Sequence, residues 1–104
     1  EHRLAGGDIN PYLHLAAVLG AAMDGIDRGA VPPAPIIGNA YEDDQPQLAT
    51  SWAEAIDAFE NSSEIARIFH PVLIENLIMT KRQELRLLAE IAPEEIWKSY
   101  LDTA

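Results

Sequence analysis

The sequence predicts a mainly α-helical chain, in which a short strand at the start is followed by about four to five helices. Apolar residues recur at helical spacing in several segments, and most of these segments begin with residues that favour a helix N-terminus. The apolar and polar alternation typical of strands is not found after Leu4. The 104 residues fit one ordinary domain, and an apolar fraction of 48% is sufficient to build a core.

The first helix is expected over residues 11–28, after a strand end at residues 1–4 and a glycine-rich turn. Asn10 is a good N-cap, Pro11 suits the first helical position, and Gly29 suits the residue after a helix C-terminus. The middle of this helix is apolar nearly all round. We therefore expect it to be buried among other elements on every side.

Residues 30–49 are rich in proline and are predicted to run as an extended connection. A connection of about twenty residues is longer than compact domains usually contain, so this one is a candidate for lining a ligand. The next helix is predicted from Trp52 to Glu60, because Ser51 and Glu54 form a capping box at its start. Its buried stripe is expected to comprise the apolar side chains Trp52, Ala53, Ile56 and Phe59.

Three further helices complete the predicted fold. A short one is expected over residues 64–69, and the longest one over residues 71–90, where leucine and isoleucine recur at helical spacing. Pro93 is expected to open a terminal helix, because proline suits the first helical position and the two glutamates that follow favour a first turn. The aromatic residues of these helices are interpreted as core.

The chain carries 17 acidic and 7 basic residues, which give a formal net charge of −10. This charge repels phosphate backbones and anionic lipids, so we expect neither nucleic acid nor a membrane surface as a partner. There is no cysteine, which excludes disulfides and thiolate metal sites and is compatible with a cytoplasmic location. The longest apolar stretch, residues 13–23, is too short to cross a bilayer.

Glu1 and Arg3 are the leading candidates for chemistry. They are two residues apart on the predicted strand, so their side chains point to the same side. The carboxylate of Glu1 is a suitable ligand for Mg²⁺ or Mn²⁺. The guanidinium of Arg3 matches the oxygens of a carboxylate or of a phosphoryl group in transfer. The same residues also fit a surface ion pair, or a pairing of Arg3 with Asp8.

The three histidines are interpreted as structural. His2 points away from its two neighbours on a strand, and neither His14 nor His70 has a histidine or acidic partner three or four residues along the chain. Gly-rich phosphate-binding motifs and the serine-elbow motif of hydrolases are also missing from the sequence. No nucleotide-binding residue is therefore identifiable.

Several short motifs follow one another in an order that is hard to obtain by chance. They are Glu1-x-Arg3, Asn10-Pro11-Tyr12-Leu13, Asp24-Gly25-Ile26, Gly38-Asn39 and Tyr41-Glu42. This order resembles the C-terminal catalytic segment of the glutamine synthetase superfamily. The resemblance extends over essentially the whole chain, and it is looser through the later helices.

The resemblance implies that residues 1–104 are a C-terminal segment cut from an α+β catalytic domain, and that this fragment alone is inactive. In the family, the glutamate of the Glu-x-Arg motif binds a catalytic metal ion, and the arginine contacts the substrate glutamate and its activated phosphate. These roles fall on Glu1 and Arg3. The implied parent is a large cytoplasmic homo-oligomer that uses ATP and Mg²⁺ or Mn²⁺. It would form γ-glutamyl phosphate, which ammonia or an amine attacks.

The superfamily has branches that use different nucleophiles, and His2 is the residue that bears on the branch. His2, between the two motif residues, resembles the γ-glutamylpolyamine ligase branch more than the branch that uses ammonia. The resemblance also leaves a γ-glutamylethanolamine ligase as an alternative. Two alternatives stay open on the sequence. One is a helical packing or interaction module without chemistry, which the acidic second half of the chain suggests. The other is a superfamily member that kept the fold and lost the reaction.

Overall fold

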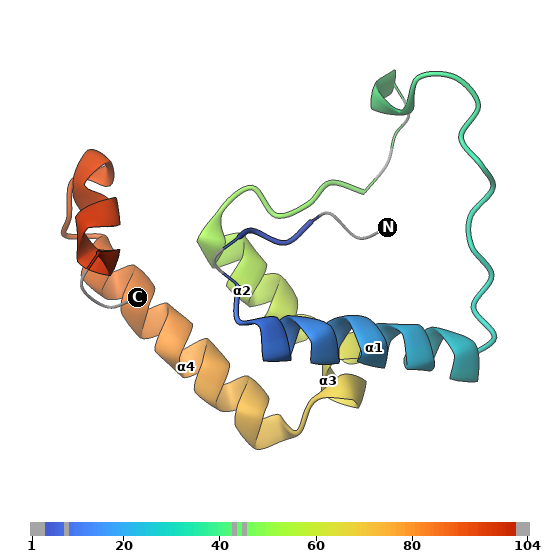
Figure 1. Ribbon diagram of the computed structural model, residues 1–104, viewed down its shortest axis with the longest axis horizontal. Coiled ribbons are helices and arrows are strands. Elements are labelled where there is room, and N and C mark those ends of the chain that lie inside the picture. Colours follow the sequence, from blue (N-terminus) through green and yellow to red (C-terminus); the bar gives the residue numbers. More distant parts are fainter. Residues whose placement is uncertain (1–3, 8, 43, 45, 102–104) are drawn as a thin grey trace. The chain divides into compact units, whose positions relative to one another are not determined.

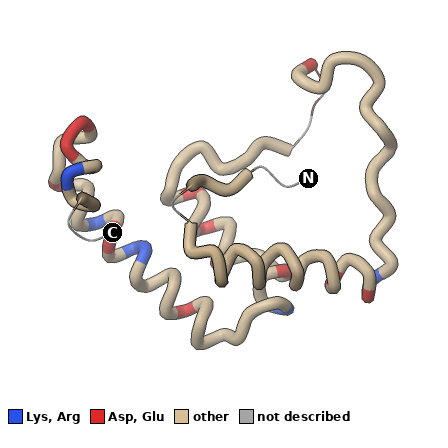
Figure 2. The backbone as a smooth tube through the Cα atoms, viewed as in Figure 1, with Lys and Arg blue, Asp and Glu red and all other residues tan. Residues whose placement is uncertain are grey.

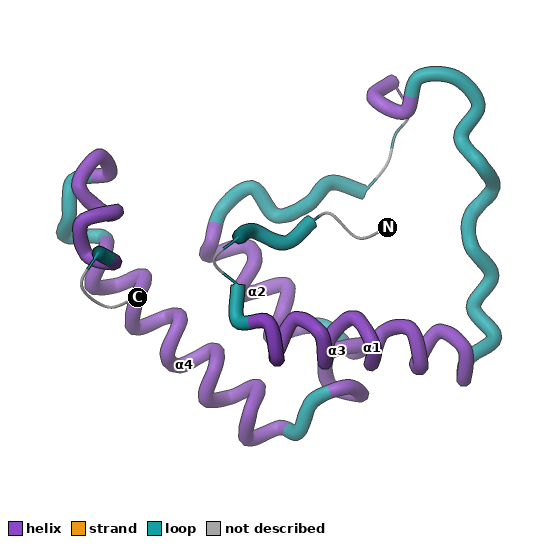
Figure 3. The backbone as a smooth tube through the Cα atoms, viewed as in Figure 1, coloured by secondary structure: helices purple, strands orange, loops and turns teal. Residues whose placement is uncertain are grey.

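The computed structural model describes residues 4–7, 9–42, 44 and 46–101, and this part of the chain is helical without any strand (Figures 1 and 3). The mainly helical fold class is thus confirmed. The chain divides into two units, which are considered separately. The first unit comprises the described residues up to Leu48 together with Ser63–Ile68, and the second comprises Ala49–Ser62 together with residues 69–101.

The first unit contains the helices α1 (Pro11–Asp27) and α3 (Ser63–Ile68) and a short 3-10 helix, η1 (Ala40–Glu42). The second unit contains α2 (Trp52–Asn61), α4 (Pro71–Leu88) and a C-terminal 3-10 helix, η2 (Pro93–Tyr100). The strand predicted over residues 1–4 is not seen: Leu4 lies outside any strand, and residues 1–3 lie outside the described part of the chain.

Both ends of α1 form as the sequence predicts. The side-chain oxygen of Asn10 accepts hydrogen bonds from the backbone N–H groups of Tyr12 (3.0 Å) and Leu13 (3.1 Å), which would otherwise lack partners in the first turn. At the other end, Gly29 has φ +62°, a backbone conformation that favours glycine. Its N–H donates to the carbonyl of Ile26 at 3.0 Å, which ends the helix.

Helix α1 packs against α3 through a close contact (Figure 1). Gly20 lies against Ile68, and a Cβ atom at position 20 would fall 3.1 Å from Cγ1 and 3.2 Å from Cβ of Ile68, and closer still to its Cγ2 atom. Glycine therefore permits an approach of the two helices that any larger residue would prevent. The contact also explains why a residue with poor helix propensity occupies the middle of α1.

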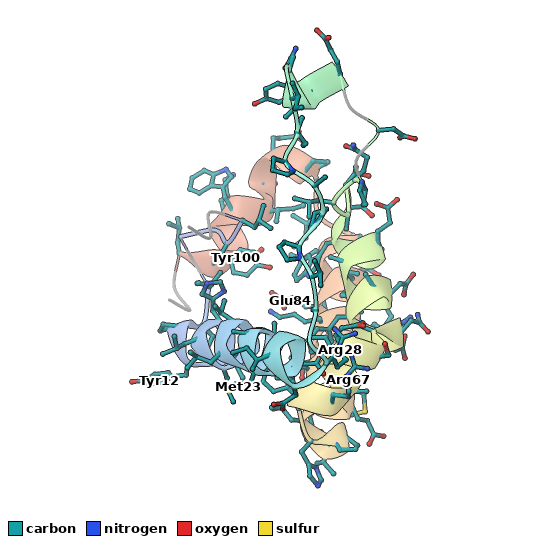
Figure 4. The ribbon with its side chains drawn as sticks, turned by 90° about the vertical axis from the view of Figure 1, so that its right-hand side faces the viewer. Tyr12, Met23, Arg28, Arg67, Glu84 and Tyr100 are labelled. Atoms are coloured by element: carbon teal, nitrogen blue, oxygen red, sulfur yellow. The ribbon has the colours of Figure 1, made fainter. Side chains whose placement is uncertain are left out.

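Helix α1 is not buried on every side in the described chain, which supplies few neighbours for it. Tyr12, Leu15 and Met23 expose 85%, 58% and 57% of their surface, and Tyr12 and Met23 extend away from the helix in Figure 4. The physical reason is the length of the partner. Helix α3 has six residues, fewer than two turns, and it covers one side of the much longer α1.

The second unit is built on the pair α2 and α4, which pack against each other. The capping box at the start of α2 is confirmed: Ser51 Oγ accepts from the Glu54 N–H (3.2 Å), and Glu54 Oε2 accepts from the Ser51 N–H (3.2 Å). Ile56 of α2 and Ile78 of α4 are the buried residues of the described chain, with 7% and 9% of their surface exposed. The core of this unit thus lies along the contact between α2 and α4.

Three predictions for the second unit need correction. Trp52 and Ala53 are exposed rather than part of the buried stripe, because the single partner helix covers a narrower face of α2 than expected. Trp97 and Tyr100 are not core residues here, since 57% and 40% of their surface is exposed. The terminal helix is a 3-10 helix. Trp97 Nε1 donates to the Glu94 carbonyl at 2.7 Å, and this carbonyl is the acceptor that the Lys98 N–H would use in an α-helix. None of the described helices is long and apolar enough to cross a bilayer.

The Gly20 contact yields a test by substitution. Gly20→Ala should lower the melting temperature of the chain, because the clash with Ile68 outweighs the gain in helix propensity of about 1 kcal/mol. Gly25→Ala is the matched control, since a Cβ there would meet only the Ala30 Cβ at 4.0 Å. It should be neutral or stabilising. Thermal unfolding followed by circular dichroism measures both variants, and equal effects at the two positions would contradict the contact.

Candidate functional site

The two residues predicted to carry chemistry, Glu1 and Arg3, lie outside the residues that the structure describes, as do His2 and Asp8. The structure therefore tests neither their predicted roles nor the alternative pairing of Arg3 with Asp8. The first described residues, 4–7, 9 and 10, are exposed. They precede α1, and Asn10 is the N-cap of this helix. What the structure adds concerns the elements that follow the motif.

Asp24, the first residue of the Asp24-Gly25-Ile26 motif, is held by two arginines. Arg67 of α3 binds it with two nitrogens: Nε donates to Oδ1 at 2.6 Å and Nη2 donates to Oδ2 at 3.0 Å. Arg28, one helical turn along the chain, places its Nε 2.9 Å from Oδ2. The Asp24 side chain is 12% exposed. Figure 4 shows Arg28 and Arg67 close together at the end of α1.

This cluster shifts the protonation of both partners. The hydrogen bond from Arg67 lowers the pKa of Asp24 below its ordinary value, and the charges of Arg67 and Arg28 act in the same direction against the cost of desolvation. The hydrogen bond to Asp24 in turn raises the pKa of Arg67. Asp24 is therefore a carboxylate held ionised and fixed in orientation, and its oxygens are engaged by cations from its own chain.

The motif Gly38-Asn39 with Tyr41-Glu42 forms the turn η1 within the long connection. Asn39 Nδ2 donates to Glu42 Oε1 at 2.9 Å, and Asn39 Oδ1 accepts from the Tyr41 N–H at 3.1 Å. Gly38, with φ +104°, turns the chain into this arrangement. Beside the turn is a shallow hollow of about 470 Å³, whose lining residues are Ala34, Pro35, Ile36, Ile37, Gly38, Asn39 and Glu42.

The connection that precedes this turn carries no charge. Between Arg28 and Glu42 there is no lysine, arginine, aspartate or glutamate, as Figure 2 shows along the tube. The expectation of an extended connection is confirmed, because η1 is the one helical turn among its described residues. That the connection lines a ligand stays a prediction.

An apolar pocket of about 220 Å³ lies in the second unit between α2 and α4. Its lining residues are Trp52, Ala55, Ile56, Phe59, Leu77, Ile78 and Lys81.

Lys81 makes two polar contacts at the edge of this pocket. Its ammonium group lies 5.4 Å from the centre of the Trp52 ring, a cation–π geometry, and 2.8 Å from Glu84 Oε2. Tyr100 donates its hydroxyl to the other oxygen of Glu84 at 2.6 Å (Figure 4). The hydrogen bonds from Lys81 and Tyr100 lower the pKa of Glu84. This carboxylate thus ties η2 to α4.

His70 is structural, as the sequence predicts. It is the N-cap of α4, and its Nδ1 accepts from the Val72 N–H at 3.3 Å. Among the described residues, no three or more histidine, aspartate or glutamate side chains gather closely enough to hold a metal ion. The described residues by themselves therefore do not form a site for a divalent cation.

Comparison with known proteins decides the family. The family model described as the catalytic domain of glutamine synthetase matches residues 1–100. The chain belongs to the glutamine synthetase family. The resemblance seen in its motifs is thereby confirmed, and the Asn10-Pro11 cap, the Asp24 cluster and the Asn39 turn are local structures of a glutamine synthetase-like chain. No solved structure matches the chain.

Curated relatives include ligases named for different amines. The chain is 36% identical to the γ-glutamylethanolamide synthetase of Streptomyces coelicolor over 82% of its own length and 18% of that protein. It is 38% identical to the glutamate–isopropylamine ligase of a Pseudomonas species, over 83% of its length and 19% of the relative. It is 32% identical to the glutamine synthetase of Aquifex aeolicus, over 98% and 24%. The chain therefore spans about a fifth of the length of these relatives.

Arg67 was not among the predicted site residues. The arginine that binds Asp24 lies 43 residues away in the sequence. No local pattern reports a contact at that separation. The available signal was weak: a single arginine near the end of a six-residue helix.

The lowered pKa of Asp24 gives a test by pH. Its contribution to the free energy of unfolding should be fully present above the ordinary carboxyl pKa of 3.8 and lost as the pH falls through the lowered folded-state value. Urea unfolding of the wild type and of Asp24→Asn from pH 7 to pH 2 measures this contribution. The difference in stability between them should shrink in acid. A difference that stays constant or grows below pH 4 would contradict the ion pair.

Proposed function

We propose that the chain is the C-terminal segment of the catalytic domain of an ATP-dependent glutamate–amine ligase. The observation that carries this proposal is the family match over residues 1–100, which includes the Glu1-x-Arg3 motif. The chain spans about a fifth of its relatives, so the activity belongs to a longer parent protein. We propose that the 104 residues alone are inactive, and that the parent is a large homo-oligomer in the cytoplasm.

The proposed reaction assigns a role to each residue of the motif. Arg3 contacts the carboxylate of the substrate glutamate and the phosphoryl group that ATP transfers to it, since its fork of donors matches both sets of oxygens. Glu1 is a ligand for Mg²⁺ or Mn²⁺, and the bound ion would neutralise phosphate charge. The product of the first step is γ-glutamyl phosphate, and an amine then displaces the phosphate to give an amide.

The names of the relatives support an amine rather than ammonia alone as the nucleophile. The curated relatives include ligases named for ethanolamine, isopropylamine and aniline products or substrates, together with glutamine synthetases. His2, within the motif, points the same way. We therefore propose a small amine as the substrate class, with ammonia as the alternative. The polyamine branch is a further alternative.

The activity is tested with the full-length parent protein. ATP-dependent phosphate release is measured with glutamate and Mg²⁺ in the presence of ammonia, ethanolamine, isopropylamine, putrescine or spermidine in turn. Release that requires an amine larger than ammonia is the expected result. Release with ammonia alone would make the parent a glutamine synthetase. Silence across the panel in a folded protein would favour a non-catalytic helical module or a member that has lost the reaction.

Arg3 is the residue whose loss should matter most in that assay. Arg3→Ala in the parent should reduce phosphate release by roughly a hundredfold or more, because a charge that stabilises the transferring phosphoryl group is lost. Its melting temperature should stay near that of the wild type. Arg86→Ala is the matched control, since Arg86 hydrogen-bonds to Gln83 of its own helix and should be dispensable for activity. Full turnover by Arg3→Ala would refute the assignment.

A further inference from the structure

The C-terminal helix η2 has little apolar packing against the rest of its unit. The extensive helix contacts of the described chain are those of α1 with α3 and of α2 with α4, and η2 belongs to neither pair. No residue of η2 is buried, and its aromatic residues Trp97 and Tyr100 are 57% and 40% exposed. Burial of apolar surface therefore contributes little to keeping η2 on α4.

The η2 helix is also weak by itself. A 3-10 helix has poorer hydrogen-bond geometry than an α-helix, and runs longer than about four residues are uncommon, yet η2 has eight residues. Two of its side-chain contacts, from Trp97 to the Glu94 carbonyl and from Lys98 to the Glu95 carboxylate, stay within η2 and cannot fasten it to another helix. A segment of this kind opens locally at a small fraction of the free energy of global unfolding.

One carboxylate of α4 binds η2 directly. Glu84 Oε1 accepts a hydrogen bond from the Tyr100 hydroxyl at 2.6 Å, across 16 residues of sequence (Figure 4). Its other oxygen, Oε2, accepts from the Lys81 ammonium group at 2.8 Å, one turn earlier on α4. The hydrogen bonds from Lys81 and Tyr100 lower the pKa of Glu84, so this acceptor is ionised at neutral pH. Hydrogen bonds to an ionised acceptor are about twice as strong as those between neutral groups.

Lys81 connects this carboxylate to α2. Its ammonium group lies 5.4 Å from the centre of the ring of Trp52, which is the first residue of α2. A side chain held by two partners keeps few orientations, so Lys81 in turn limits the orientations of the Glu84 carboxylate. The contacts therefore run from Trp52 of α2, through Lys81 and Glu84 of α4, to Tyr100 of η2.

We propose that Glu84 is a latch: its hydrogen bond with Tyr100 keeps η2 closed on α4, and loss of this bond lets η2 open as a separate local unit. The α2–α4 pair stays folded in the open form, because its buried residues, Ile56 and Ile78, belong to the contact between these two helices. The opening is an order–disorder transition of one segment. A ligand that binds one of the two forms more tightly shifts the population of η2. This inference goes beyond the proposed function and does not depend on it.

The test is hydrogen–deuterium exchange of the full-length parent protein, followed for peptides from η2 and from α2. Tyr100→Phe removes the hydroxyl group and keeps the ring, and Glu84→Gln keeps the shape of the side chain and loses its charge. Each variant should speed exchange in η2 by roughly tenfold or more, which is the size expected for the loss of a hydrogen bond to a charged group. Exchange in α2 should stay at the wild-type rate.

Tyr41→Phe is the matched control, since it removes the same hydroxyl group from a tyrosine of the first unit that is 98% exposed. It should leave exchange in η2 unchanged. Equal exchange of η2 in Tyr100→Phe and Tyr41→Phe would overturn the latch. Acceleration of equal size in α2 and η2 would also overturn it, because it would show general destabilisation of the unit. A wild-type η2 that exchanges as fast as an unstructured peptide would do the same.

A double-mutant cycle shows whether the two groups act as one latch. Tyr100→Phe combined with Glu84→Gln should speed exchange in η2 no more than the stronger of the two single variants, because both remove the same hydrogen bond. Additive effects would mean that the two residues act separately, which contradicts the proposal. The readout needs no turnover, so a failure of the proposed ligase reaction leaves this result unaffected.

Discussion

The first unit depends on the contact between Gly20 of α1 and Ile68 of α3, with the Asp24–Arg67 ion pair beside it. A helix of six residues is far too short to be stable in water by itself, so α3 exists as a helix because α1 supports it. The dependence is mutual, since α3 is the one helix of the described chain that packs extensively on α1. The absence of a Cβ atom at Gly20 and the two hydrogen bonds from Arg67 to Asp24 thus determine how α1 and α3 pack against each other.

The second unit is held differently. Its core lies where Ile56 of α2 meets α4 at Ile78, and polar contacts also join the two helices. Arg82 binds Asp57 at 2.9 Å and also pairs with Glu60, while Lys81 lies over the ring of Trp52. Glu84 then extends the network to Tyr100 of η2. The unit therefore combines a small apolar core with polar contacts made by the charged residues Lys81, Arg82 and Glu84 of α4.

Local features of the fold could be predicted because short-range chemistry determines them. The Asn10 cap, the Ser51–Glu54 capping box and the turn at Gly29 each involve residues within four positions of one another. The Asp24–Arg67 pair was beyond prediction, since it depends on tertiary packing across 43 residues. For the candidate site the limit is different. The Glu1-x-Arg3 motif was found from its order relative to later motifs, and its geometry lies outside the described residues.

Helix α3 belongs to the first unit, although the segments on either side of it, α2 and α4, belong to the second. The chain leaves the second unit after Ser62 and returns to it at Phe69. During synthesis on the ribosome, α1 would therefore emerge well before its partner, and it would have to wait for about forty residues with its apolar side uncovered. Neither unit corresponds to a continuous stretch of sequence, so a single proteolytic cut cannot release one of them intact.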